Sequence, residues 1–411
     1  MKNKLTLILY FICLSVFAWW TWILTAPNLV LTSWAPYWNW QQWMWNTFYQ
    51  SRNFISQTYL LLVIALFCLF FNLVRQHQFA NFKNFALSLA ICCMPLMYSF
   101  NALSFDVFNY LFNAKMVAVY QADPHHQIAL DFADDEWTRF MHNTNTPAPY
   151  GYGWTAISLV PYYLTGGKFT LSWFSIRILN FILLSLTLLL MSKYQKKLNG
   201  ENNWQALALF FFNPLVLIET LTNMHNDLWM MLPALWSIFL ITVNTQTNLE
   251  KKSSPYEIKN INQILGSAVL LLFSSTIKYA TLILIPLWIV IFLLRFKTKI
   301  SDLLKKWQIY IFDAAAILMF LPLLTTRSQF FHPWYLLWSL IFIPFVKNKI
   351  VRTSLLILSF SSLVRYVPVL QEGGFGAWTL LEQQLITFIP LLVYLIFYLG
   401  QKFYALLQKQ K

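Results

Sequence analysis

Long apolar segments alternate with short polar ones along almost the whole chain. The apolar segments include residues 5–26, 54–74, 170–191 and 381–399. A helix needs roughly 20 mostly apolar residues to cross the hydrocarbon core of a bilayer. By that criterion the pattern predicts an all-α polytopic membrane protein with about 12 spanning helices. The apolar segments fill the chain, so residues 1–411 are expected to form a single integral membrane domain without a separate soluble domain.

Two apolar segments depart from this simple pattern. Residues 154–164 are short and contain a proline, so we expect them to lie in the interface or form a re-entrant hairpin. Residues 264–296 are too long for one helix and are predicted to form two short helices bent near Lys278. In the alternative, each segment crosses the membrane once. That arrangement places the lysines between residues 193 and 259 outside, against the positive-inside rule.

The composition agrees with a chain that is solvated by lipid, since hydrophobic residues make up 58% of it and charged residues 11%. The net charge of +14 is spread over short segments between apolar runs. This distribution is typical of the positive-inside rule and argues against a nucleic-acid partner. It predicts a multi-pass protein of the cell membrane (plasma or inner membrane) with cytoplasmic N- and C-termini. The 4 cysteines lie in apolar runs, as buried thiols do.

One stretch, residues 101–154, is polar enough to hold water-facing chemistry. It carries a large share of the 15 acidic residues of the chain and half of its 6 histidines. The basic segments before and after it place it on the outer side of the membrane. We therefore expect residues 101–154 to form a large extracytoplasmic catalytic loop that contains amphipathic juxtamembrane helices.

Polar side chains near the start of this loop recur at the spacing of one helical face: Asp106, Asn109, Tyr110 and Asn113. Aromatic and aliphatic side chains fall on the other face: Phe105, Phe108, Leu111 and Phe112. The pattern predicts an amphipathic helix at the membrane surface, with its apolar face in lipid and its polar face in water. A carboxylate on the polar face can accept a proton from a hydroxyl group, as a general base does. The alternative for Asp106 is an acid that interacts with the helix dipole.

A second acidic cluster occupies residues 134–136. Asp134 and Glu136 are candidates for the base or for metal ligands, and the alternative is a solvated run that caps a helix. His125 and His126 form a pair that can bind metal, but no third and fourth ligand stand at regular spacing. The sequence therefore assigns no cofactor with certainty, and a divalent metal with unknown ligands stays an alternative.

Polar and charged residues also interrupt the later apolar segments. Asn226 and Asp227 stand at a predicted helix start, where N-capping is the alternative role. Lys278 and Arg327 are cations near the predicted outer leaflet, where a cation suits a lipid phosphate. Snorkelling of these long side chains to the interface is the alternative. Helix–helix pairing is expected for the remaining charged groups: Arg177, Glu219, Asp313 and Arg365.

Several short motifs occur in order along the chain. They are Phe105-Asp106-Val107-Phe108-Asn109-Tyr110, Ala122-Asp123-Pro124-His125, Pro149-Tyr150-Gly151-Tyr152-Gly153-Trp154, Asn213-Pro214, His225-Asn226-Asp227, Lys278-Tyr279 and His332-Pro333-Trp334-Tyr335. With these motifs the chain resembles the C-type glycosyltransferases (GT-C fold), and most closely the bacterial polyprenyl-phosphate-mannose-dependent mannosyltransferases. It departs from the usual Asn-Pro-Tyr of that family at residues 123–125, and from the usual Tyr-Gly-Pro at residues 150–152.

The resemblance implies transfer of a hexose, expected to be mannose, from a polyprenyl-phosphate carrier to an extracytoplasmic glycan, lipid or protein acceptor. Asp106 would be the general base that deprotonates the acceptor hydroxyl, which attacks the anomeric carbon as the polyprenyl phosphate leaves. Lys278 and Arg327 would hold the phosphate. The other substrate-binding candidates are Asn109, Tyr110, Asn113, His125, Tyr150, Tyr152, Trp154, Asn226, Asp227, Tyr279, His332, Trp334 and Tyr335.

Two other functions stay open at this point. A transporter or flippase of polyprenyl-linked glycans is expected to show inverted repeats with paired broken helices, and no repeat is visible in the sequence. A membrane polymerase or ligase that uses a lipid-linked oligosaccharide differs from the transferase only in its donor, which the sequence does not identify.

Overall fold

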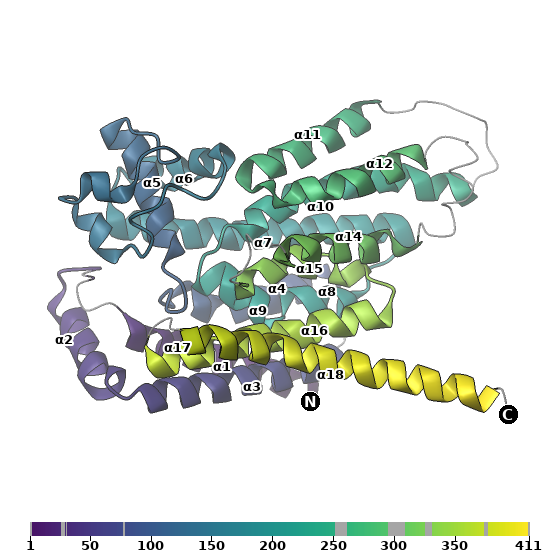
Figure 1. Ribbon diagram of the computed structural model, residues 1–411, viewed down its shortest axis with the longest axis horizontal. Helices are drawn as coiled ribbons and strands as arrows, with labels where there is room; N and C mark the ends of the chain where they lie inside the picture. The colour runs from purple at the N-terminus through teal and green to yellow at the C-terminus, as the bar shows by residue number, and fades with distance from the viewer. Residues whose placement is uncertain are drawn as a thin grey trace.

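The computed structural model describes residues 2–25, 29, 31–76, 79–250, 261–294, 309–324, 331–373 and 377–409. Within these ranges the chain is helix and connecting segments, with no strand (Figure 1). The longer helices are α1 (Lys2–Thr21), α3 (Arg52–Gln76), α4 (Phe82–Met97), α7 (Phe169–Asn199), α10 (Asp227–Glu250), α11 (Ile261–Ile277), α16 (Lys349–Val364) and α18 (Ala377–Lys409). The shorter ones are α2 (Ala35–Met44), α5 (Asp106–Tyr120), α6 (Tyr152–Leu164), α8 (Trp204–Phe211), α9 (Pro214–Leu217), α12 (Ile285–Leu293), α14 (Ile311–Phe320), α15 (Leu337–Leu340) and α17 (Tyr366–Glu372).

The predicted class, an all-α polytopic membrane protein, is confirmed. Among the described residues, five helices are long and apolar enough to cross a membrane: Lys4–Leu24, Arg52–Gln76, Phe169–Asn199, Lys349–Glu372 and Thr379–Gln408. A sixth span results if Trp204–Phe211 and Pro214–Thr222, which are bent by 51° at the break between them, count as one. Further apolar helices of 10–17 residues lie between these. The predicted number of about 12 spans therefore stays a prediction.

The predicted break near Lys278 is confirmed. Helix α11 ends at Ile277, and Lys278 itself is extended, with φ −146° and ψ 131°. The chain then continues as the 3-10 helix η6 (Tyr279–Leu284) and α12. The lysine side chain is thus presented from a gap between two short helices, where its backbone is not part of a helix.

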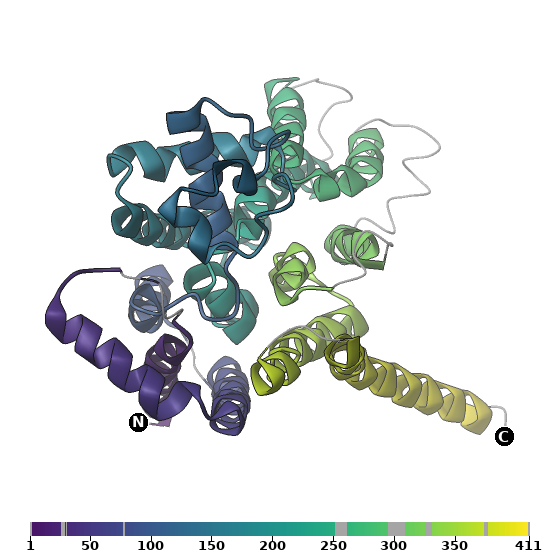
Figure 2. The same ribbon diagram turned by 60° about the vertical axis from the view of Figure 1, so that its left-hand side comes forward.

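The segment predicted to be too short to cross alone forms α6, which has 13 residues. At about 1.5 Å per residue this helix is shorter than the roughly 30 Å of a bilayer core. It packs against α5, and both helices contact α7. In Figures 1 and 2 these short helices form one group at the end of the molecule where α7 begins.

The amphipathic helix predicted at Asp106 is present as α5, but its predicted environment is wrong. Its apolar face does not lie in lipid, because Phe108, Leu111 and Phe112 are all buried inside the protein. Phe108, for example, stacks on Phe169 of α7 with ring centroids 5.9 Å apart. The polar face is also covered, since Asn109 and Tyr110 are buried as well. The segment that follows α5 folds back over it, so this helix belongs to the interior of the protein.

An ion pair holds the segment of residues 121–151 against α5. Lys115 lies 2.5 Å from Asp135, and Tyr120 donates a hydrogen bond of 2.8 Å to the same carboxylate. Asp135 also accepts the backbone N–H of Trp137 and so begins the 3-10 helix η4 (Glu136–Phe140). These contacts join the middle of this segment to the last two turns of α5. Partial burial raises the pKa of Asp135, but the contacts with Lys115, Trp137 and Tyr120 lower it by more, so the net shift is downward.

Two glycines let the start of α6 touch the end of α11. The backbone N–H of Gly151 donates to the carbonyl of Ile277 at 2.9 Å. A Cβ atom on Gly151 would lie 2.0 Å from the Thr276 carbonyl oxygen, and one on Gly153 would lie 2.2 Å from Thr276 Oγ1. A larger residue at Gly151 would meet backbone atoms, so the motif joins the start of α6 directly to the segment that carries Lys278.

The variant Gly151→Ala is expected to unfold at a lower temperature than the wild type, because its methyl group meets backbone atoms that cannot move aside. Overpacking of this kind costs about 1–3 kcal/mol. The matched control is Gly400→Ala, since a Cβ at that position meets nothing within 4 Å. Thermal unfolding of both variants in detergent tests this; equal unfolding temperatures for Gly151→Ala and the wild type would contradict the tight contact.

Candidate active site

The centre of the site is Asp106, the first residue of α5. Its carboxyl Oδ2 accepts a hydrogen bond of 2.9 Å from the hydroxyl of Tyr150 and lies 3.7 Å from Nδ1 of His225. The side chain is only 17% exposed. Burial raises the pKa of Asp106 above its ordinary value of 3.8, while the Tyr150 hydrogen bond and the charge of Lys278 lower it. The carboxylate is therefore a stronger base than an exposed aspartate.

His225 lies directly behind Asp106 and is fully buried. Its ring stacks on Trp334 with centroids 3.8 Å apart, and its Nε2 lies 3.4 Å from Oε2 of Glu219. Burial holds the pKa of His225 well below its ordinary value, and the nearby charge of Lys278 acts in the same direction. The imidazole is therefore neutral at physiological pH.

Glu219 is placed by an irregular segment of backbone. It sits in the π-helix η5 (Ile218–Thr222), and Met224, just before the histidine, has a left-handed backbone with φ 58°. The carboxylate of Glu219 accepts hydrogen bonds from Asn223 at 2.8 Å and from Tyr366 at 3.1 Å. π-helical turns and left-handed residues other than glycine are unfavourable and are concentrated at functional sites.

A buried ion pair forms the second half of the site. Lys278 Nζ lies 2.7 Å from Oδ1 of Asp227, and the side chains are 11% and 0% exposed. The indole N–H of Trp338 donates to the same Oδ1 atom. The ammonium group also lies 5.2 Å from the ring centre of Tyr150, the residue that bonds to Asp106. The predicted substrate-binding residues Asp227 and Lys278 are thus brought next to Asp106.

Several buried polar atoms in this region have no hydrogen-bond partner among the described residues. They include both amide atoms of Asn226, the Oδ2 atom of Asp227, the Oδ1 atom of Asn109 and both ring nitrogens of His225. Buried polar groups in native proteins are nearly always paired. A group of unpaired ones around one carboxylate indicates a place where a polar ligand or water supplies the missing bonds.

Aromatic side chains border the same region. The ring of His332 stacks on Trp334 at 4.3 Å and lies against the edge of Tyr335 at 5.3 Å. Burial lowers the pKa of His332 to about 3, so this ring is also uncharged. Tyr110 packs at right angles to Trp154, with ring centroids 5.0 Å apart. Aromatic residues from the motif at residues 332–335 and from the motif at residues 149–154 therefore lie around the Asp106 site.

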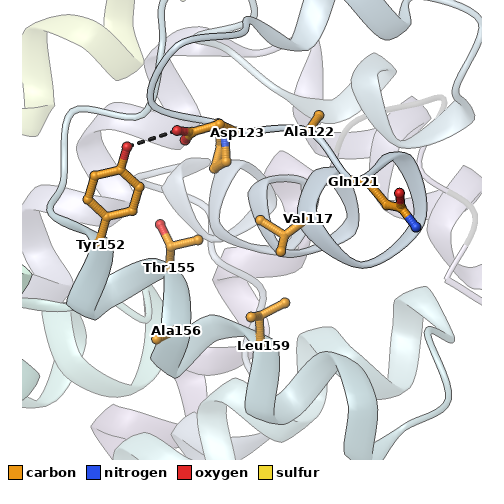
Figure 3. Close-up of a pocket in the computed structure, with 9 residues that line it drawn as sticks. Val117, Gln121, Ala122, Asp123, Tyr152, Thr155, Ala156 and Leu159 are labelled. Atoms are coloured by element: carbon orange, nitrogen blue, oxygen red, sulfur yellow. Dashed lines mark hydrogen bonds between the residues drawn. The ribbon is translucent and has the colours of Figure 1, made fainter.

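A second group of predicted residues surrounds a separate, open cavity of about 500 Å³ between α5 and α6 (Figure 3). The hydroxyl of Tyr152 donates to Asp123 at 2.8 Å on its rim. The ring of His125 lies tilted against that of Tyr152, with centroids 4.0 Å apart, and contacts the Thr155 hydroxyl at 2.9 Å. The lining also includes Val117, Gln121, Ala122, Pro124, Ala156 and Leu159.

The other predicted site residues are not joined to Asp106 by any described contact. Glu136 forms an exposed ion pair with Arg139 at 2.9 Å, and Asp134 is exposed. Tyr279 is 61% exposed, Asn113 is half-buried, and Arg327 lies outside the described residues. No group of three or more His, Cys, Asp or Glu in the described ranges is placed to hold a metal ion. Catalytic roles for Asp134 and Glu136 stay predictions.

Sequence reasoning missed two residues of the site. His225 was noted only within the motif shared with Asn226 and Asp227, and Glu219 was assigned to helix pairing. The available signal was a glutamate inside an apolar segment, five residues after Pro214 and six residues before a histidine. Arg177 does connect helices, but through backbone carbonyls: it donates to Leu221 at 2.9 Å and so fixes the turn between Glu219 and His225.

Comparison with known proteins gives one match. A family model described as alpha-(1->6)-mannopyranosyltransferase, N-terminal domain, matches residues 13–294, which is more than half of the chain. The matched range includes Asp106, Glu219, His225, Asp227 and Lys278. No curated protein and no solved structure matches the chain.

The variant Asp227→Ala is expected to lower the unfolding temperature strongly. It leaves the ammonium of Lys278 and the indole N–H of Trp338 without their shared acceptor in a buried site. Removing one partner of a buried ion pair costs about 3–5 kcal/mol. The matched control is Arg139→Ala, which removes an exposed ion pair and should not change stability measurably. Thermal unfolding in detergent measures both; an unchanged midpoint for Asp227→Ala would show that the pair does not stabilise the fold.

Proposed function

The chain belongs to the alpha-(1->6)-mannopyranosyltransferase family, whose members are glycosyltransferases, and from that premise we propose how it acts. It transfers mannose from a polyprenyl-phosphate carrier to a hydroxyl group of a glycan, lipid or protein acceptor at the outer face of the cell membrane. The observation that supports this best is the buried Asp106 carboxylate next to the Lys278–Asp227 ion pair and a group of unpaired polar atoms.

Asp106 is the general base in this proposal. It takes the proton of the acceptor hydroxyl as the acceptor oxygen attacks the anomeric carbon of the donor. Its raised pKa favours this role, because a base with a pKa closer to the working pH removes a proton more effectively. Tyr150 fixes the orientation of the carboxylate through its hydrogen bond to Oδ2.

Lys278 binds the donor phosphate. An ammonium group has three N–H donors, and the described contacts of Lys278 use one of them, toward Asp227. The other two are available to phosphate oxygens, and the developing negative charge on the leaving phosphate strengthens such bonds. Arg327 is the second cation proposed for the phosphate, on the sequence alone.

The donor is lipid-linked because the site belongs to a membrane domain. The apolar helices around it offer a place for a polyprenyl chain, while the sequence has no Gly-rich phosphate loop of the nucleotide-binding type. The sugar is bordered by the rings of His332, Trp334 and Tyr335 and by the unpaired amide of Asn226. Hydrogen bonds from sugar hydroxyls would satisfy such an amide.

Purified protein is expected to transfer mannose from polyprenyl-phosphate mannose to acceptors extracted from the membrane, and not from a nucleotide-linked mannose. The physical reason is that only the lipid-linked donor reaches a site held among apolar helices. Radiolabelled donors of both kinds, supplied to detergent-purified protein free of polyprenyl phosphate, measure this. Transfer from the nucleotide sugar under these conditions would contradict the proposal.

Asp106→Asn is expected to lower kcat by about 10²–10⁴, the usual contribution of a general base, with normal expression. The matched control in the same loop is Asp131→Asn, since the described contact of that carboxylate is with the backbone N–H of Ile128. If Asp106→Asn stays active while Asp134→Asn or Glu136→Gln is inactive, the base belongs to the second acidic cluster.

The pH profile gives an independent reading of the same residue. Asp106 is active only when ionised, so activity falls as the pH drops through its pKa. Burial raises that pKa, so the acid limb of kcat/KM lies above the pH expected for an exposed aspartate of pKa 3.8. The Tyr150 hydrogen bond lowers the same pKa, so Tyr150→Phe moves the limb to higher pH. If the acid limb of kcat/KM stays at the same pH in Tyr150→Phe, the limb belongs to a group other than Asp106.

A further inference from the structure

His225 lies between two carboxyl groups. Its Nδ1 is 3.7 Å from Asp106 Oδ2, and its Nε2 is 3.4 Å from Glu219 Oε2. The ring is fully buried, and neither nitrogen has a hydrogen bond of normal geometry to a described residue. Each nitrogen instead has a carboxyl oxygen just beyond bonding distance, and catalytic contacts of this kind often shorten only when substrate is bound.

The number of protons in this array determines which contacts can form. A neutral imidazole has one N–H donor and one acceptor nitrogen, whereas an ionised carboxylate can only accept. With a single proton, on Nε2, the ring donates to Glu219, and the contact between Nδ1 and Asp106 contains no hydrogen. That contact is the longer of the two. A second proton, arriving on Asp106, would complete both hydrogen bonds.

The surrounding residues hold the three groups in line. Trp334 fixes the plane of the His225 ring by stacking, and Asn223 and Tyr366 hold the Glu219 carboxylate. The guanidinium of Arg177 bonds to the carbonyls of Leu221 and Thr222, within the turn that connects Glu219 to His225. An array that is buried and held from several sides loses little free energy in reorganisation when a proton moves.

The titratable groups that face the array come from several segments of the chain. Lys278 and His332 both disfavour a charge on the imidazole. The Asp227 carboxylate disfavours ionisation of Asp106, whereas Tyr150, Lys278 and Tyr110 favour it. The combined effect keeps His225 neutral and raises the affinity of Asp106 for a proton, so the empty Nδ1 contact is available to receive one.

We propose that His225 and Glu219 form a proton relay behind Asp106, an inference that rests on the proposed role of Asp106 as the base. In the transfer step the acceptor oxygen forms a bond to the anomeric carbon. The bond from that carbon to the phosphate oxygen breaks, and its electron pair leaves with the phosphate. The acceptor proton passes to Asp106 and on to Nδ1 of His225, while the proton on Nε2 passes to Glu219. His225 and Glu219 act through Asp106 and do not touch the substrate.

The test compares Glu219→Gln, His225→Gln and the double variant with the wild type, using detergent-purified full-length protein and polyprenyl-phosphate mannose. Gln at either position fills a similar space but cannot pass on a proton. We expect kcat to fall about tenfold or more in each single variant, with the donor KM changed less than twofold. The double variant should be no slower than the slower single variant, because residues that act as one unit are not additive.

The pH profile separates a relay from a structural role. The relay requires an ionised Glu219 to accept the proton from Nε2, so protonation of Glu219 should add its own acid limb to the wild-type pH profile of kcat/KM, and Glu219→Gln should lack that limb. The matched control is Asp313→Asn, another buried carboxyl, which accepts the backbone N–H groups of Lys347 and Asn348 far from the site in sequence. It should keep the wild-type kcat and acid limb.

The relay is overturned if Glu219→Gln and His225→Gln keep the wild-type kcat and acid limb while Asp106→Asn is inactive. It is also overturned if the donor KM rises and kcat does not change, since that pattern indicates a binding role. If His225→Gln fails to fold, Glu219→Gln decides the question from the other end of the array. An active Asp106→Asn variant would instead refute the proposed function, whatever the two relay variants do.

Discussion

The ion pair between Lys278 and Asp227 is the contact on which the arrangement of the site depends. It joins two irregular points of the chain, the gap between α11 and η6 and the start of α10. A lone ammonium or carboxylate in a buried site would be very unfavourable, so each partner makes the burial of the other tolerable. Because Asp227 stands two residues after His225 and Lys278 lies over Tyr150, the pair also brings the two neighbours of Asp106 together.

Several polar side chains at the centre of the site lack hydrogen-bond partners among the described residues, whereas several charged ones outside the centre have them. Charged residues outside the centre of the site have hydrogen-bond partners within the described protein: Asp135, Arg177 and Asp313. Asn226 and His225, at the centre, do not. An apolar core of the same size would be more stable. The unpaired atoms are therefore best understood as binding capacity for a polar ligand, maintained at the expense of stability.

Local patterns in the sequence predicted helices and breaks well, and predicted environments less well. The face that carries Asp106 and Asn109 could be recognised from its spacing, and the break at Lys278 from the length of the apolar segment. The burial of α5 could not, because an apolar face that packs on protein has the same pattern as one that packs on lipid. Glu219 was missed for a related reason. A π-helix and the left-handed residue Met224 determine which residues surround it, and neither feature can be recognised from the spacing of side chains in the sequence.

The close contact between Gly151 and Thr276 has a mechanical consequence. It ties the segment that carries Tyr150 to the end of the helix that precedes Lys278, through backbone atoms that have almost no freedom to slide. A phosphate that draws Lys278 away from Asp227 would therefore also displace the tyrosine that orients Asp106. In the proposed mechanism, binding of the donor phosphate at Lys278 and alignment of Asp106 would therefore be coupled, and an acceptor that arrived before the donor would meet the carboxylate in a different position.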